Sequence, residues 1–80
     1  MSNSNIKKSQ ISNGYLIKYH ANETSIWSKG KIIDGKPDGY WEWYRVDGTL
    51  KRSGNFKIGN QIGKWITYDS NGKEYKKTNY

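Results

Sequence analysis

Few residues of this chain could do chemistry, and their spacing does not assemble a reaction centre. The sequence contains one histidine, His20, and no cysteine, which excludes a multi-histidine or thiolate metal site. Glycoside hydrolysis would need two carboxyl groups facing one groove, and the carboxylates are not spaced for that. Asp47 and Asp69 adjoin turn sequences, and Glu42 lies between two tryptophans and should point away from both. We therefore predict that the protein is not an enzyme and needs no cofactor and no metal ion.

The glycines do not form a phosphate-binding loop. Neither the dinucleotide fingerprint nor the glycine-rich loop that ends in Lys-Ser or Lys-Thr occurs in the sequence. No helical pattern follows any of the nine glycines. The turns of a repeat explain their spacing better.

Aromatic and basic side chains are the residues that could bind a partner. The 80 residues include four Trp, seven Tyr and one Phe, and the net charge of +7 is spread over both halves. Trp, Tyr and Arg dominate the energetics of protein interfaces. Basic residues among aromatic rings also suit nucleic acid, since they neutralise phosphates and stack on bases. A solvated surface is the third interpretation of the same charge, and the sequence leaves all three open.

The elements that hold these side chains follow a repeat with a spacing of 24 residues, formed by residues 30–53 and 54–77. A looser partial copy covers residues 14–29 and lacks the glycines, as a capping repeat would. Ile32 stands where the second copy has a phenylalanine. The repeated structural positions are Gly30, Gly35, Gly39, Trp41, Tyr44 and Gly48, then Gly54, Phe56, Gly59, Gly63, Trp65, Tyr68 and Gly72.

Each copy predicts a β-hairpin. The aromatic run 40–46 precedes the turn sequence Asp47-Gly48, and residues 49–58 alternate between two faces. Further strands are expected at 14–20, 25–34, 64–69 and 73–78, with a wider loop from Gly59 to Gly63. The fold class is therefore all-β, a single antiparallel meander of about six strands built from hairpin repeats. The repeat domain covers residues 13–80, and the Ser-, Asn- and Lys-rich residues 1–12 should be disordered.

The repeat resembles a known family. The pattern G-x-aromatic-x-x-G-x-x-x-G-x-W-x-x-Y-x-x-x-G is similar to the MORN repeat, in the bacterial variant that has tryptophan in place of a late glycine. The match covers residues 30–72 well and 14–29 loosely. The resemblance implies a solenoid of hairpins and a role in protein contact, as in antitoxin-like partners of toxin–antitoxin or immunity systems. It implies no catalysis.

Aromatic positions that differ between the copies are candidates for partner contacts, because the shared core does not need them. Trp43 matches Thr67, Tyr40 matches Lys64 and Trp27 matches Lys51 at the spacing of 24. Arginine and neighbouring lysines complete the set, although strand alternation should put Lys51 and Arg52 on opposite faces. The predicted partner-binding residues are Trp27, Tyr40, Trp43, Arg45, Lys51, Arg52 and Lys64.

The expected function is a small module that binds and inhibits an acidic protein partner in the cytoplasm. An antitoxin, an immunity protein or a phage-borne inhibitor would each fit, and a binder of nucleic acid or of a phosphorylated nucleotide is the alternative. No apolar run is long enough to span a membrane, and Met1–Gln10 has no apolar stretch typical of a signal peptide. A homodimer stays open. The last strand, at 74–80, would be an exposed edge that either pairs with another chain or is protected by its lysines.

Overall fold

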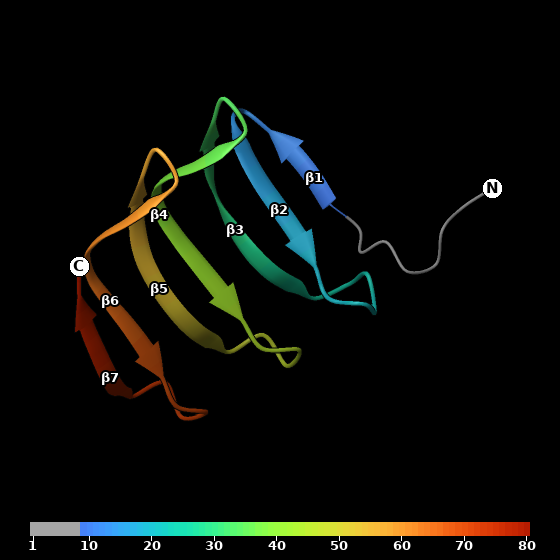
Figure 1. Cartoon of the computed structure of the whole chain (residues 1–80). Coiled ribbons are helices and arrows are strands. Elements are labelled where there is room, and N and C mark those ends of the chain that lie inside the picture. Colours follow the sequence, from blue (N-terminus) through green and yellow to red (C-terminus); the bar gives the residue numbers. More distant parts are fainter. Residues whose placement is uncertain (1–8) are drawn as a thin grey trace.

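The computed structural model describes residues 9–80, which form one open sheet of seven antiparallel strands (Figure 1). The strands are β1 (Ser9–Ser12), β2 (Tyr15–Tyr19), β3 (Ile26–Ile33), β4 (Lys36–Tyr44), β5 (Leu50–Lys57), β6 (Asn60–Tyr68) and β7 (Glu74–Asn79). Strands that follow one another in the sequence are neighbours in the sheet, so β1 and β7 are its two edges. The predicted all-β antiparallel meander is confirmed. No helix that could cross a membrane occurs within residues 9–80.

The predicted disordered segment 1–12 was wrong for residues 9–12, which add one strand to the predicted meander of about six. Ser9–Ser12 forms β1 and pairs with β2, with Ser9 opposite Lys18. The cause is a two-residue turn at Asn13 and Gly14, whose φ angles of 53° and 81° fit a type I′ hairpin turn. The remainder of the predicted disordered segment, residues 1–8, lies outside the described residues.

The wider loop predicted from Gly59 to Gly63 was also wrong. Lys57 pairs with Asn60, so Ile58 and Gly59 form a two-residue turn with φ angles of 49° and 82°. Gly63 lies inside β6 at a φ of 69°, beside the register shift between β5 and β6. Such irregularities bend a strand locally and increase its twist.

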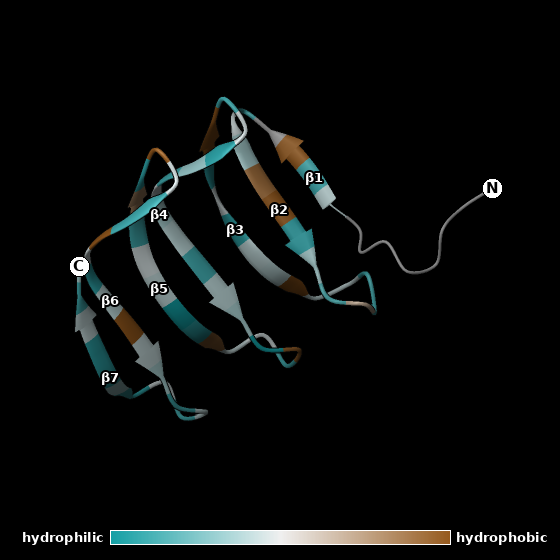
Figure 2. Ribbon diagram, in the orientation of Figure 1, coloured by the Kyte–Doolittle hydropathy of each residue, from teal (hydrophilic) through white to brown (hydrophobic). Residues whose placement is uncertain are grey.

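The core consists of two tryptophans, each lying on a glycine of the preceding strand. Trp41 and Trp65 are 5% and 3% exposed, and both belong to the repeated positions. A Cβ atom added to Gly30 or to Gly54 would lie 2.1 Å from the nearest atom of the Trp41 or the Trp65 ring. Only a residue without a side chain leaves room for the indole at that place. Figure 2 shows why a hydropathy scale detects this core poorly, since brown bands are short and the middle strands are mostly pale or teal.

The indole N–H groups join the hydrogen-bond pattern of the backbone. Trp41 Nε1 donates to the carbonyl oxygen of Lys31 at 2.9 Å, and Trp65 Nε1 donates to that of Asn55 at 3.1 Å. Both carbonyls lie beside a register shift, where the strand ladder is interrupted. Each indole therefore adds apolar area to the core. It also donates a hydrogen bond to a backbone carbonyl that the irregular strand ladder leaves without a partner.

Edge-to-face contacts connect the tryptophans into one aromatic line. The Phe56 ring lies 6.1 Å from Trp41 at 86° and 5.0 Å from Trp65 at 87°. Tyr80 contacts Trp65 in the same way, at 6.1 Å and 78°. Such pairs contribute about 0.5–1.5 kcal/mol each beyond their buried area. Tyr80 follows Phe56 by 24 residues, so the repeat extends past the predicted limit at residue 77.

The close contact between Gly54 and Trp65 gives a first prediction. Gly54→Ala should lower the free energy of unfolding by about 1–3 kcal/mol, because the added methyl forces the indole or the strand to move. The measurement is urea unfolding followed by tryptophan fluorescence. Asn55→Ala, an exposed neighbour in the same strand, is the control and should change stability little. Equal unfolding midpoints for Gly54→Ala and the parent chain would contradict this packing.

The turn at Ile58 gives a second prediction. Two turns of the same geometry have Asn13 and Asp34 at the position that Ile58 occupies, with φ angles of 53° and 52°. A β-branched residue is strained there, and its side chain is 63% exposed, so packing offers little in return. Ile58→Asn should raise the free energy of unfolding by about 1 kcal/mol. Ile62→Asn, at an exposed isoleucine inside β6, should not stabilise the chain. An equal effect of the two substitutions would show that turn strain is not the cause.

Candidate partner-binding face

A row of side chains crosses the sheet from β2 to β7 on the face that carries the aromatic core. Directly opposite residues of antiparallel strands point to the same face, so the strand registers define the row. In order, it consists of Lys18, Ser28, Trp43, Arg52, Thr67 and Lys76. With strands about 4.8 Å apart, these five steps span about 24 Å. Cations lie at both ends of the row and in its second half.

Lys51 lies on the same face as Arg52, which corrects the prediction that strand alternation would separate them. Trp43 is opposite Arg52, whereas Tyr44 is opposite Leu50, so Lys51 is an extra residue in the ladder. A bulge of this kind places two residues against one and re-aims the side chains. Lys51 and Arg52 accordingly line the same two pockets.

The same bulge recurs in the other two hairpins that have a long turn, β2–β3 and β6–β7. The register between β2 and β3 shifts at Tyr19 and leaves Trp27 as the extra residue. The register between β6 and β7 shifts at Tyr68 and leaves Tyr75 as the extra residue. Positions 27, 51 and 75 are spaced by 24, so the repeat adds one further side chain per hairpin to this face. We call the row, together with Trp27, Lys51, Trp65, Tyr75 and Tyr80, the aromatic–basic face.

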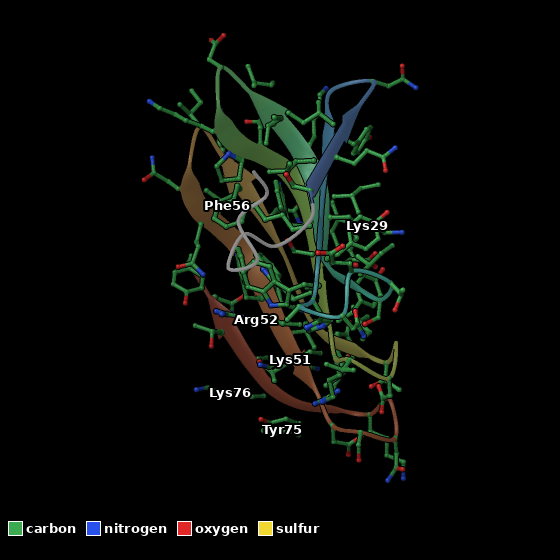
Figure 3. The ribbon with its side chains drawn as sticks, turned by 90° about the vertical axis from the view of Figure 1, so that its right-hand side faces the viewer. Lys29, Lys51, Arg52, Phe56, Tyr75 and Lys76 are labelled. Atoms are coloured by element: carbon green, nitrogen blue, oxygen red, sulfur yellow. The ribbon has the colours of Figure 1, made fainter. Side chains whose placement is uncertain are left out.

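The aromatic–basic face has a basic half over β5 to β7. The guanidinium carbon of Arg52 lies 4.7 Å from the centroid of the Trp65 ring, a cation–π contact that orients the charge. Lys51 and Lys76 are exposed beside it. Figure 3 shows Arg52, Phe56 and Lys76 on one side of the ribbon and Lys29 on the other. A depression of about 310 Å³ in this half is lined by Lys51, Arg52, Trp65, Thr67, Tyr75, Lys76, Thr78 and Tyr80.

The other half of the face, over β2 to β4, is mostly apolar, with Lys18 as its one cation in the row. A depression of about 280 Å³ there includes Leu16, Ile32, Pro37 and the rings of Trp41 and Trp43. A third one, of about 230 Å³ between Trp27, Trp43, Lys51 and Arg52, joins the two halves. None of the residues that line these three depressions is acidic. Among the described residues, no acidic side chain therefore lies beside the positive charge of these depressions.

The structure brings four of the seven predicted partner-binding residues together. Trp27, Trp43, Lys51 and Arg52 surround the depression in the middle of the face. Tyr40 lies on the opposite face, where its hydroxyl donates to Glu42 Oε2 at 3.0 Å. The remaining two, Arg45 and Lys64, line none of the three depressions of the aromatic–basic face.

Arg45 connects two hairpins through their turns. Its guanidinium donates to the carbonyl oxygens of Tyr68 at 2.6 Å and of Leu50 at 3.1 Å. His20 makes an equivalent contact one hairpin earlier, since its Nε2 lies 2.9 Å from the carbonyl oxygen of Tyr44. The side chains of Arg45 and His20 each contact a backbone carbonyl at the end of the next hairpin, so hydrogen bonds connect consecutive turns. This position gives Arg45 a structural role.

The opposite face carries a carboxylate between two phenols. Glu42 accepts hydrogen bonds from the hydroxyl groups of Tyr40 and Tyr44, which places it away from the tryptophans as expected. Partial burial, and then the hydrogen bond to the Glu42 carboxylate, hold the pKa of Tyr44 well above its usual range. Lys29 lies 5.7 Å from the centre of the Tyr44 ring. These groups satisfy one another and fix the outer side of β4.

Six members of the aromatic–basic face were in neither the predicted partner-binding set nor the predicted structural set: Lys18, Ser28, Thr67, Tyr75, Lys76 and Tyr80. The signal for three of them was present, because Tyr75, Lys76 and Tyr80 follow Lys51, Arg52 and Phe56 by 24 residues. Lys18 gives no repeat signal and is placed only by its register with Ser28.

Within residues 9–80, no group of three or more His, Asp or Glu side chains is arranged as metal ligands would be. No protein-family model, no curated protein and no solved structure matches the chain.

The contact between Tyr44 and Glu42 gives a third prediction. Because the pKa of Tyr44 is raised in the folded state, its contribution to stability is complete below the ordinary tyrosine pKa of about 10. It is lost as the pH rises further, since the unfolded chain ionises first. Urea unfolding from about pH 8 to about pH 11 should show a smaller loss of stability for Tyr44→Phe than for the parent chain. Tyr75→Phe, which removes an exposed phenol, should follow the parent, and equal slopes in all three proteins would refute the assignment.

Proposed function

We propose that this protein is a non-enzymatic binding module that holds an acidic protein partner on its aromatic–basic face. The observation that carries the proposal is the coexistence of exposed cations and aromatic rings on one face whose three depressions are lined by no acidic side chain. Within the described residues the one ion pair lies elsewhere, between Lys77 and Glu74 at 3.1 Å. Lys51, Arg52 and Lys76 are therefore available to the carboxylates of another chain. Complementary charge of this kind speeds association and selects the partner.

The apolar half of the face would supply the anchor. Trp43 is half-buried and borders two depressions, next to Trp27. Partly buried tryptophans with a pocket beside them are typical hot spots of protein interfaces. A partner with an apolar side chain flanked by acidic residues would match both halves at once.

Inhibition would follow from occlusion. The described sheet measures 43 × 32 × 19 Å. It is therefore broad and thin, because it consists of a single layer of strands with their side chains. A broad sheet whose turns are held together can block the active site of a partner enzyme without any catalytic activity. The resemblance to the bacterial MORN-repeat variant favours this role, whether the module serves as an antitoxin, an immunity protein or a phage-borne inhibitor.

Single-stranded nucleic acid is the second candidate for the same face. The row places the ring of Trp43 between the cations Lys18 and Arg52, and platforms for single strands combine rings with cations in this way. A protein partner is favoured because two of the four indole rings, those of Trp41 and Trp65, are almost completely buried and cannot stack on bases.

The fourth prediction tests the face directly. The tagged protein is used to capture partners from cells of its source organism, with and without nuclease. We expect an acidic protein that resists nuclease, and we expect Lys51→Ala with Lys76→Ala to weaken its binding about tenfold, mainly through slower association. Affinities and rates are measured by surface plasmon resonance at low and moderate salt.

The matched control removes the same charge from the other face. Lys29→Ala with Lys57→Ala changes two exposed lysines that line none of the depressions of the aromatic–basic face, and it should leave affinity nearly unchanged. Equal losses in the two double variants would refute the assignment of the face. Loss of all captured material on nuclease treatment would favour the nucleic-acid candidate.

A further inference from the structure

The strand β7 offers unpaired backbone groups at the edge of the sheet. The N–H of Tyr80 donates to the carbonyl oxygen of Gly63 at 2.9 Å, so this amide points inward toward β6. Backbone groups alternate along an antiparallel strand, and the N–H and C=O groups of Lys77 and Asn79 therefore point to the open side. The other edge, β1, has four residues and no charged side chain. Of the two edges, β7 offers the longer strand and the charge.

A further hairpin of the same kind does not fit on β7. Thr78 stands where the preceding hairpins have Gly30 and Gly54, at the spacing of 24. Trp65 is opposite Thr78, as Trp41 is opposite Gly54. A Cβ atom added to Gly54 would collide with the indole of Trp65 in the next strand. The side chain of Thr78 would collide in the same way with a tryptophan of a further hairpin placed beside β7.

A second copy of this chain is also a poor occupant. Its β4 and β6 are already paired on both sides, so only its edge strands β1 and β7 could join the sheet. The described β1, Ser9–Ser12, has no carboxylate that would match Lys76. Pairing of β7 with β7 would bring Lys76 and Lys77 of the two copies close together, and like charges across strands are unfavourable. Edge lysines are a common protection against this type of self-pairing.

An acidic strand meets none of these obstacles. Lys76 has no carboxylate partner in the described chain, and Lys51 and Arg52 lie in the same depression. Tyr75 and Tyr80, 65% and 56% exposed, border that depression at the edge. A strand beside β7 would therefore project every second side chain toward cations and two exposed rings.

We infer that β7 accepts an extended acidic segment of the partner as an eighth strand of the sheet. The inference rests on the proposed function and names the form in which the partner binds. Backbone hydrogen bonds to Lys77 and Asn79 give affinity, and acidic side chains beside Lys76 give specificity. The residue opposite Thr78 must be smaller than tryptophan.

Two peptides of equal charge separate strand pairing from simple charge attraction. One alternates glutamate with threonine over about eight residues and can extend a sheet, because threonine favours strands. The other alternates glutamate with proline and lacks every second N–H donor. Each is titrated into the full chain labelled with nitrogen-15, and amide shifts and affinities are recorded by NMR.

We expect the Glu-Thr peptide to bind at least about fivefold more tightly and to slow hydrogen exchange at the amides of Lys77 and Asn79. Equal affinities of the two peptides would overturn strand addition and leave the acidic-partner proposal standing. Binding of neither peptide would count against both.

A substitution at the edge gives an independent test. Asn79→Pro removes an outward N–H and leaves the inward bond of Tyr80 to Gly63 in place, since proline is tolerated on the open side of an edge strand. It should reduce the affinity for the Glu-Thr peptide to that for the Glu-Pro peptide, while Asn79→Ala should keep it. Unchanged binding by Asn79→Pro would overturn the inference, and the amide spectrum of each variant reports whether the sheet is intact.

Discussion

The contact of an indole with a glycine backbone is the constraint on which the rest of the molecule depends. With 32% hydrophobic residues, the chain cannot build a layered core, and a single sheet has no second layer to cover it. Trp41 and Trp65 replace that layer, because each ring covers the strand beside it and donates to one of its neighbouring carbonyls. The two contacts have closely similar geometry, so the 24-residue spacing is the spacing of this unit. Phe56 contacts both of these rings, and Tyr80 packs against Trp65 alone.

The fold was predictable because its determinants are local and repeated. Paired glycines and tryptophans at one spacing predicted hairpins in a meander, and the buried tryptophans are the ones that recur. Two features were missed because their signals are weaker. The turn at Asn13 and Gly14 allows β1 to pair with β2, although this short polar strand has no hydrophobic pattern of its own. The turn at Ile58 contains a residue that normally argues against that geometry.

The candidate site was predictable only in part, for a different physical reason. Alternation of side chains assumes a regular ladder, and each hairpin breaks the ladder once beside its long turn. No glycine marks these bulges, which contain Trp27, Lys51 and Tyr75. Aromatic identity was likewise insufficient to assign a face, since Tyr40 satisfies Glu42 on the opposite side. Arg45 was chosen for its residue type, and its position at the turn commits it to backbone carbonyls.

The modular contact between neighbouring hairpins has a consequence for how such a chain can change in length. Every strand pairs with the strands before and after it in the sequence, so one 24-residue unit could be inserted or deleted at a glycine boundary without altering the others. Each insertion would widen the sheet by two strand spacings, about 10 Å, and would add one bulged position to the exposed surface. Thr78, which lies in the last strand, would still terminate the series. Breadth of the recognition surface and stability of the fold are thus separate variables, set by the number of units and by the composition of each.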